Sequence, residues 1–95
     1  MDSPVRKLNP LLRLAVLAGV ETAVKLHIRR GDDLDARDST GATPLILAAT
    51  KKKKGVVRLL LDAGADPTVV DFGGQSALAH ASAGGCLETM TLLRD

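Results

Sequence analysis

Aromatic side chains are almost missing from this sequence. Its 95 residues include one phenylalanine, Phe72, and neither tyrosine nor tryptophan. A core of leucine, alanine and valine favours closely packed helices, because β-sandwiches draw on β-branched and aromatic residues. The shortage also removes the aromatic platforms on which single-stranded nucleic acids stack. Hydrophobic residues make up 45% and charged residues 25%, which is typical of a folded globular domain.

Cysteine, net charge and long apolar runs are also scarce. The single cysteine, Cys86, excludes an intramolecular disulfide and a cysteine-rich zinc site. It is consistent with a reducing compartment, and we expect a cytoplasmic protein. A net charge of +2 indicates by itself neither a nucleic-acid nor a membrane partner. The longest apolar stretch, residues 11–20, contains Arg13 and is too short to span a bilayer.

What the sequence does have is an internal repeat with a period of 33 residues. The recurring pairs are Gly31 and Gly64, Asp38 and Asp71, Gly41 and Gly74, Leu45 and Leu78, and Leu59 and Leu92. Such a period predicts a stack of three units over about 9–37, 38–70 and 71–95, within a single domain covering 1–95. In the central unit we expect Leu45 and Leu59 at inward positions.

The sequence of each unit predicts two helices followed by a loop that is bounded by glycines. In the middle unit Thr43 fits a helix N-cap, and Pro44 fits the first helical position, where its missing N–H costs nothing. The second helix ends at Gly64, because glycine accepts the left-handed conformation. Residues 32–41 and 65–74 are rich in aspartate and glycine and predict hairpin-like turns between the helix pairs.

The segment DSTGATPLILAA, followed by VVRLLLDAGADP, resembles the ankyrin repeat, including the TPL signature and the GAD after the second helix. The resemblance covers residues from about 9 to 95 and implies an all-α solenoid of three ankyrin repeats. It also implies a non-catalytic module that binds another protein, with no cofactor, metal or membrane; nucleic-acid and small-molecule ligands are disfavoured. We interpret the chain as the N-terminal part of a larger cytoplasmic regulatory protein.

Polar residues in the first and third units are interpreted as caps, because the ends of a stack face water. They replace apolar or acidic residues of the central unit and are Thr89, Ser82 and Arg94 in the third unit and His27 and Arg29 in the first.

No motif indicates catalysis or metal binding. His27 and His80 fall in different parts of different repeats, without a serine or cysteine partner at a motif spacing. His80 lies one position past the slot in which ankyrin repeats carry a turn-bracing histidine, which implies that this brace is absent. Cys86 is interpreted as a half-buried packing thiol. The acidic loop 32–38 lacks the glycine and terminal glutamate of a calcium loop.

The run Lys51–Lys54 departs most clearly from the ankyrin pattern. The resemblance implies Gly-His at positions 52–53, with the glycine in a left-handed turn, where lysine would cost about 1–2 kcal/mol. A turn shifted toward Gly55 or an extended first helix would avoid this strain. We interpret the run as a solvated helix end that suits the helix dipole. The alternative function is binding of nucleic acid or another anionic surface through these lysines.

The resemblance implies a binding face made by the hairpin tips and the exposed side of the first helices. The matching positions here are Leu17, Arg37, Ser39, Thr40, Ala42, Thr50, Lys51, Val70, Phe72 and Gln75. Phe72 is either an interface anchor or folded back over a neighbouring turn. We expect it to be substantially exposed and to share a surface with Val70, Thr40 and Gln75.

Overall fold

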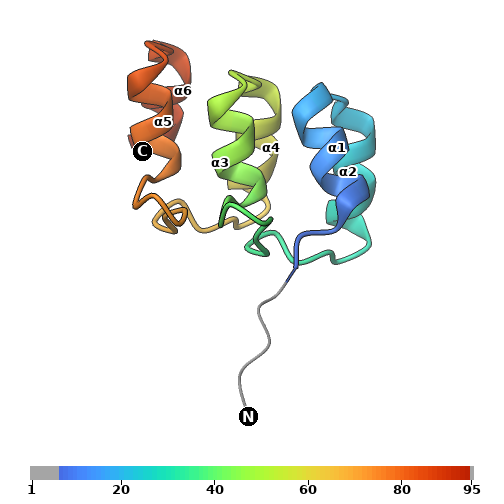
Figure 1. Cartoon of the computed structure of the whole chain (residues 1–95). Helices are drawn as coiled ribbons and strands as arrows, with labels where there is room; N and C mark the ends of the chain where they lie inside the picture. Colours follow the sequence, from blue (N-terminus) through green and yellow to red (C-terminus); the bar gives the residue numbers. More distant parts are fainter. Residues whose placement is uncertain (1–6, 95) are drawn as a thin grey trace.

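The structure is a computed structural model that describes residues 7–94, and it contains three pairs of helices in a row (Figure 1). In chain order the helices are α1 (Pro10–Ala18), α2 (Glu21–Arg29), α3 (Pro44–Thr50), α4 (Lys54–Asp62), α5 (Ala77–Ala83) and α6 (Leu87–Arg94). Helices α1, α3 and α5 form one layer, and α2, α4 and α6 form the other. The predicted all-α solenoid is confirmed: over residues 7–94 the only strand-like pairings are two isolated bridges.

Helices of the first layer begin with a side-chain cap, whereas α2 and α4 of the second layer do not. The N-cap side chains of Asn9, Thr43 and Ser76 accept hydrogen bonds from N–H groups in the first turns of α1, α3 and α5. Neither α2 nor α4 has such a bond. Each long loop therefore enters the first layer at a fixed point, because the cap satisfies an N–H that helical bonding leaves open.

The core lies between the two layers of helices. Alanine recurs with the 33-residue period at positions 15, 48 and 81, which are 7%, 0% and 1% exposed and allow the first-layer helices to approach closely. Leu45 is fully buried, as expected. The expectation for Leu59 needs correction, because Leu60 is the fully buried leucine of α4 and Leu59 is half-buried. Leu59 lies beside a surface depression shared with Ile28 of α2.

One left-handed turn recurs between the two helices of every pair. Gly19, Lys52 and Gly85 are 33 residues apart and have φ values of 73°, 59° and 70°. Both predicted ways of avoiding strain are therefore wrong, since α3 ends at Thr50 and Gly55 lies inside α4. The lysine accepts a strained backbone because the packing of the helix pairs requires the turn at this position.

Two of the residues interpreted as caps are buried instead. His27 is 6% exposed and Thr89 is fully buried. The His27 Nδ1 lies 2.7 Å from Asp32 Oδ2, and this hydrogen bond lowers the pKa of the Asp32 carboxyl. The Thr89 hydroxyl lies 3.0 Å from Cys86 Sγ, so both polar groups find partners without reaching water.

The other three proposed caps, Ser82, Arg29 and Arg94, are exposed as expected. The Cys86 thiol, interpreted as half-buried, has intermediate exposure, and its hydrogen bond to Thr89 lowers its pKa.

Candidate interaction surface

An aspartate closes the tip of each long loop. In the first loop, Asp38 Oδ1 accepts hydrogen bonds from the backbone N–H and the hydroxyl of Thr40 at 2.8 and 2.7 Å. In the second loop, Asp71 Oδ1 accepts bonds from the N–H groups of Gly73 and Gln75, both at 2.9 Å. Aspartate suits these positions because its short side chain satisfies N–H groups a few residues ahead. The two tips are therefore built in the same way.

The second carboxylate oxygen of each tip aspartate is held from a helix. Asp38 Oδ2 lies 3.2 Å from Arg13 Nε of α1, and Asp71 Oδ2 lies 2.8 Å from His80 Nε2 of α5. The prediction that the second tip lacks a histidine brace is therefore wrong. Helical side chains lean toward the start of their helix, which brings the His80 ring back to its own loop.

Hydrogen bonding keeps both tip carboxylates ionised. Partial burial acts to raise the pKa of Asp38, but hydrogen bonds led by those from Thr40 outweigh it, so the pKa is lowered. The pKa of Asp71 is lowered by the bond from the Gln75 N–H and then by that from His80. Each loop tip is therefore most stable when its aspartate is ionised and negatively charged.

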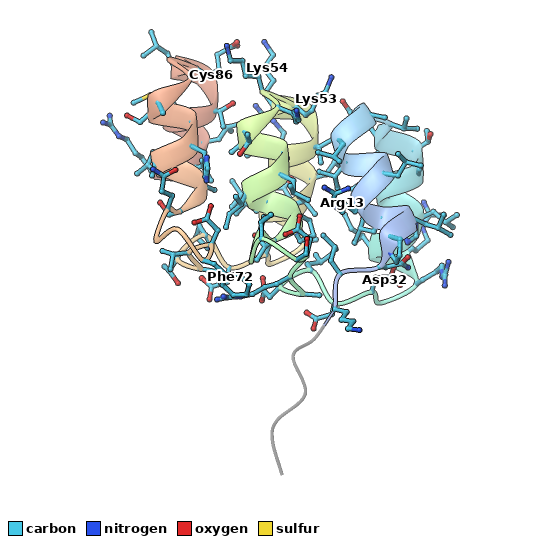
Figure 2. The ribbon with its side chains drawn as sticks, in the orientation of Figure 1. Arg13, Asp32, Lys53, Lys54, Phe72 and Cys86 are labelled. Atoms are coloured by element: carbon cyan, nitrogen blue, oxygen red, sulfur yellow. The ribbon has the colours of Figure 1, made fainter. Side chains whose placement is uncertain are left out.

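Phe72 lies exposed at the tip of the second loop, as predicted, with 67% of its surface accessible (Figure 2). The residue is nonetheless fixed, because its N–H donates to the Thr40 carbonyl at 3.1 Å. Its ring covers Gly41, where an added Cβ would lie 2.6 Å from Phe72 Cδ1. The Arg37 guanidinium carbon lies 5.9 Å from the ring centroid, within cation–π range. The ring is therefore exposed and also folded over a neighbouring turn, and its role as an interface anchor stays a prediction.

A groove of about 660 Å³ runs between Phe72 and the start of α1. Arg37, Ser39 and Phe72, three of the predicted binding residues, line it. The segment before α1 lies against the first loop, because the Leu8 N–H donates to the Arg37 carbonyl at 2.9 Å. We call this feature the tip groove.

The remaining predicted binding residues occupy other places. Exposed ones are Thr40, Thr50, Lys51, Val70 and Gln75, and Leu17 is half-buried. Ala42 is 4% exposed, so its inclusion in an exposed face is corrected: its methyl group belongs to the core under the first loop. Thr50 and Lys51 come at the end of α3, away from the loop that holds Phe72.

Arg13, Lys7, Leu8 and Pro10 also line the tip groove and were not predicted. The 33-residue period could have identified Arg13 as a residue that holds the first loop. Arg13 lies 33 residues before Ile46, the residue in the histidine slot of the central repeat, and so it occupies that slot in the first repeat. No periodic signal marks Lys7.

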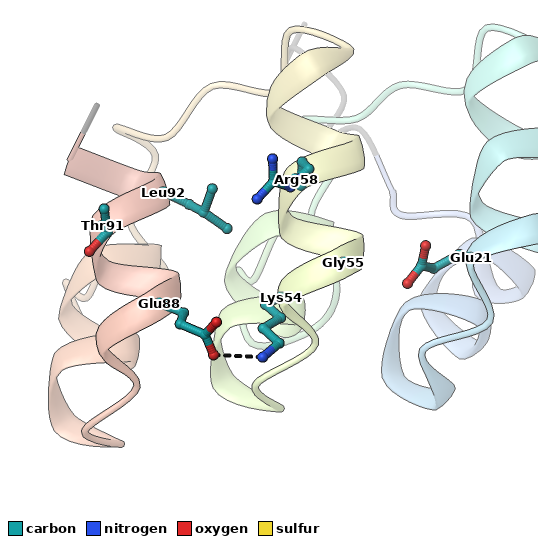
Figure 3. Close-up of a pocket in the computed structure, with 7 residues that line it drawn as sticks. All are labelled: Glu21, Lys54, Gly55, Arg58, Glu88, Thr91 and Leu92. Atoms are coloured by element: carbon teal, nitrogen blue, oxygen red, sulfur yellow. Dashed lines mark hydrogen bonds and ion pairs between the residues drawn. The ribbon is translucent and has the colours of Figure 1, made fainter.

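The four consecutive lysines span the turn from the end of α3 to the start of α4, and Lys53 and Lys54 lie at the end of the molecule opposite Phe72 (Figure 2). Figure 3 shows Lys54 paired with Glu88 of α6, with 2.6 Å between Nζ and Oε1, and this hydrogen bond raises the pKa of Lys54. The Lys53 chain covers Gly19, and Lys52 Cε lies 3.3 Å from the Cβ position of Gly84. The run therefore spreads toward neighbouring repeats on both sides.

A further depression of about 590 Å³ lies along α4 and α6, and Figure 3 shows the residues that line it. Glu21 of α2 contacts Gly55, and Arg58 lines the depression. Over residues 7–94 no group of three histidine, cysteine or acidic side chains is arranged to hold a metal ion. None of the helices in that range is long and apolar enough to cross a membrane.

Sequence comparison agrees with this architecture. The family described as ankyrin repeats (3 copies) matches residues 12–95. The chain belongs to the ankyrin repeat family. Ankyrin repeats generally mediate protein–protein interaction, which directs attention to exposed surfaces of the stack.

Similar proteins are much longer than this ankyrin-repeat chain. It is 45% identical over 73 residues to neurogenic locus notch homolog protein 1 of Danio rerio, covering 76% of this chain and 3% of that protein. It is 43% identical over 83 residues to neurogenic locus notch homolog protein 2 of Homo sapiens, covering 86% and 3%. It is 40% identical over 98 aligned residues to the B-cell lymphoma 3 protein homolog of Mus musculus, covering 99% and 22%.

Proposed function

We propose that this chain is a non-catalytic module that binds another protein through its loop tips and the exposed side of the first-layer helices. The observation that carries the proposal is Phe72, an apolar ring that is two-thirds exposed and held in place from Thr40 and Gly41. A fixed, exposed aromatic ring loses little conformational freedom on binding and is a frequent anchor of protein interfaces.

Two further observations support this assignment. Ser39, Val70 and Gln75 surround the loop tips as exposed side chains that a partner would reach together with Phe72. The family also matches nearly the whole described range, and protein binding is its general role. The ten proposed binding residues, Ala42 excepted, thus remain the proposed surface.

The proposal also places the chain in a larger setting. We infer a single ankyrin-repeat domain over 1–95, with repeats at about 9–37, 38–70 and 71–95, as the N-terminal part of a longer cytoplasmic regulatory protein. Residues 1–6 and 95 of that domain lie outside the described residues. The small share of each relative that the chain spans supports a longer protein. The single cysteine supports a reducing compartment.

The experiment starts from the intact chain, immobilised to identify the proteins that bind it. The affinity of the recovered partner is then measured for Ser39→Glu and Gln75→Glu, which add a negative charge to the proposed surface. Thr22→Glu, at an exposed position of α2, is the matched control. We expect at least tenfold weaker binding for the first two variants and no change for the control. Equal affinity for all three would refute the proposed surface.

A separate measurement tests the cellular setting. An antibody raised against the chain should detect, in the cytosolic fraction of the source cells, a protein far larger than 9.9 kDa. A band at 9.9 kDa alone, or recovery in another fraction, would contradict this part of the proposal.

The alternative function, binding of nucleic acid through Lys51–Lys54, stays a prediction. The pairing of Lys54 with Glu88 and the spread of the run over two neighbouring repeats count against a continuous cationic surface. Nucleic-acid binding through these lysines would weaken steeply with added salt, whereas the protein interaction proposed above depends mainly on an apolar anchor.

A further inference from the structure

The tip groove combines apolar surface with positive charge. The ligand that we infer for this groove rests on the proposed function. Its apolar lining comes from Leu8, Pro10 and Phe72. Its charged lining is mainly basic and consists of Lys7, Arg13 and Arg37, with Asp38 as the acidic member. These residues come from the segment before α1, from the first turn of α1 and from both loop tips, so the groove exists only in the folded stack.

The negative charge of Asp38 is directed away from solvent. Its side chain is 7% exposed and bonds Arg13 Nε as well as the N–H and hydroxyl of Thr40. Within residues 7–94, by contrast, the side chains of Lys7 and Arg37 form no ion pair or hydrogen bond, and the Arg37 guanidinium lies over the Phe72 ring. The groove thus offers two unpaired cations beside an exposed apolar ring.

We propose that the tip groove binds an acidic, extended segment of a partner protein. An apolar side chain of that segment packs against Phe72 and Pro10, while its carboxylates bind the Arg37 guanidinium and the Lys7 ammonium. Charge complementarity selects this occupant, because a guanidinium binds carboxylate through two parallel hydrogen bonds. The ring of Phe72 holds Arg37 beside the groove and reduces the freedom it loses on binding.

The same groove is a poor fit for nucleic acid. Two unpaired cations neutralise few phosphates, whereas nucleic-acid sites gain their affinity from many such contacts. The four lysines lie at the other end of the helices, so they do not extend the groove into a basic track (Figure 2). Phe72 is also the only aromatic ring in the chain and offers no series of stacking positions.

The test uses the intact chain and a displayed library of random peptides of about twelve residues. We expect selected sequences to carry aspartate or glutamate on both sides of an aliphatic or aromatic residue. Selected peptides are then synthesised with a fluorescent label and titrated against the variants. Basic or uncharged consensus sequences would overturn the proposal, as would tighter binding of a single-stranded oligonucleotide than of any acidic peptide.

Variants then assign the peptide to the groove. Hot-spot contacts lead us to expect at least about 30-fold weaker peptide binding for Phe72→Ala. Arg37→Glu should weaken it about tenfold or more, and Phe72→Leu, which keeps an apolar side chain, should recover part of the affinity. Leu87→Ala, at an exposed leucine of α6, and Lys25→Glu, at an exposed lysine of α2, are the controls and should bind as the parent does. Unfolding in urea identifies any variant that no longer folds, in which case Arg37→Glu and Phe72→Leu decide.

Other occupants of the groove give different outcomes. If a second copy of the chain fills it, sedimentation would show self-association that Phe72→Ala abolishes, and this would overturn the proposal. If the chain's own residues 1–6 fill it, a chain beginning at residue 7 would bind the peptides at least tenfold more tightly. This result would also overturn the proposal. Should the natural partner respond to Ser39→Glu and Gln75→Glu but not to Arg37→Glu, the groove inference fails while the proposed function stands.

Discussion

His80 Nε2 and Asp71 Oδ2 lie 2.8 Å apart and connect helix α5 to the loop that precedes it. The histidine slot of the central repeat holds Ile46, whose apolar side chain cannot bind a carboxylate. His80 thus supplies from the same repeat a bond that Asp38 receives from Arg13 of the neighbouring repeat. The two loop tips share one shape but depend on partners in different places.

Replacing His80 should loosen the second loop more than it disturbs the helices. In His80→Ala the Asp71 side chain keeps its bonds from Gly73 and Gln75 but loses its link to α5. We expect faster amide hydrogen exchange at Gly73 and Gln75, with helix content by circular dichroism unchanged. Ser82→Ala, at an exposed position of the same helix, is the control. Unaltered exchange at both amides in His80→Ala would show that the bond does not brace the loop.

Acid should destabilise the protein through its loop aspartates. The folded pKa values of Asp32, Asp38 and Asp71 lie below those of unfolded aspartate. Their stabilising contribution is therefore complete above about pH 4 and is lost as the pH falls through the lowered folded values. We expect the urea midpoint to fall between about pH 4.5 and 2.5. In Asp71→Asn the fall should be smaller; a midpoint that stays constant in the parent protein would contradict this account.

Lys52→Gly should stabilise the fold. The lysine backbone has φ 59°, a conformation that glycine adopts without a Cβ clash and that Gly19 and Gly85 adopt in the other repeats. Relief of that strain is expected to add about 1 kcal/mol to the free energy of unfolding, reduced by the greater freedom of glycine in the unfolded chain. Urea unfolding measures the gain. Lys51→Gly, where φ is −91°, should give no gain, and equal effects at both positions would rule out strain relief.

Gly41 and Gly74 form a matched pair for measuring the contact with Phe72. They have φ values of 83° and 79°, so alanine is strained at both. At Gly41 the new methyl group would also meet the Phe72 ring at 2.6 Å, whereas nothing lies within 4 Å at Gly74. Gly41→Ala should therefore destabilise more than Gly74→Ala, by about 1 kcal/mol or more. Adding Phe72→Ala should remove the part of that difference due to the ring, while the clash with the Phe72 backbone nitrogen, 2.7 Å from the new Cβ, remains. A difference that does not shrink at all would show that the ring takes no part in the clash.

Leucine replacements in α4 should rank by burial. Leu60 is fully buried, and Leu60→Ala is expected to cost about 2–5 kcal/mol, a large part of the stability of a small domain. Leu59 is half-buried beside Ile28, so Leu59→Ala should cost clearly less. Urea denaturation of both variants checks the order. The reverse order would mean that α4 is rotated from the orientation described above.

Features encoded by local or periodic signals were predictable from the sequence. The 33-residue period located the helix pairs, and Thr43 followed by Pro44 marked the start of α3 correctly. Exposure of Phe72 followed from its place in a loop rich in aspartate and glycine. The distinction between Leu59 and Leu60 was not accessible, because adjacent leucines differ by about 100° around the helix and both are apolar.

The tip groove depended on contacts that no local pattern records. Lys7 lines the groove because the neighbouring Leu8 N–H donates a hydrogen bond to the Arg37 carbonyl, which holds the segment before α1 against the first loop. The burial of Ala42 likewise depends on neighbouring residues of the core rather than on its position in the loop. The period places residues within a repeat, whereas this groove is formed by parts of successive repeats.

Within residues 7–94, the strained turn at Lys52 lies in the central repeat, which has a neighbouring repeat on both sides. In a linear array, each unit is held by its intrinsic stability and by its interfaces with adjacent units. A central unit weakened by its own backbone depends more on both interfaces, so the array should lose all three repeats in a single transition. Lys52→Gly would then reduce cooperativity even as it raises stability, because a self-sufficient central unit can persist when an outer repeat frays.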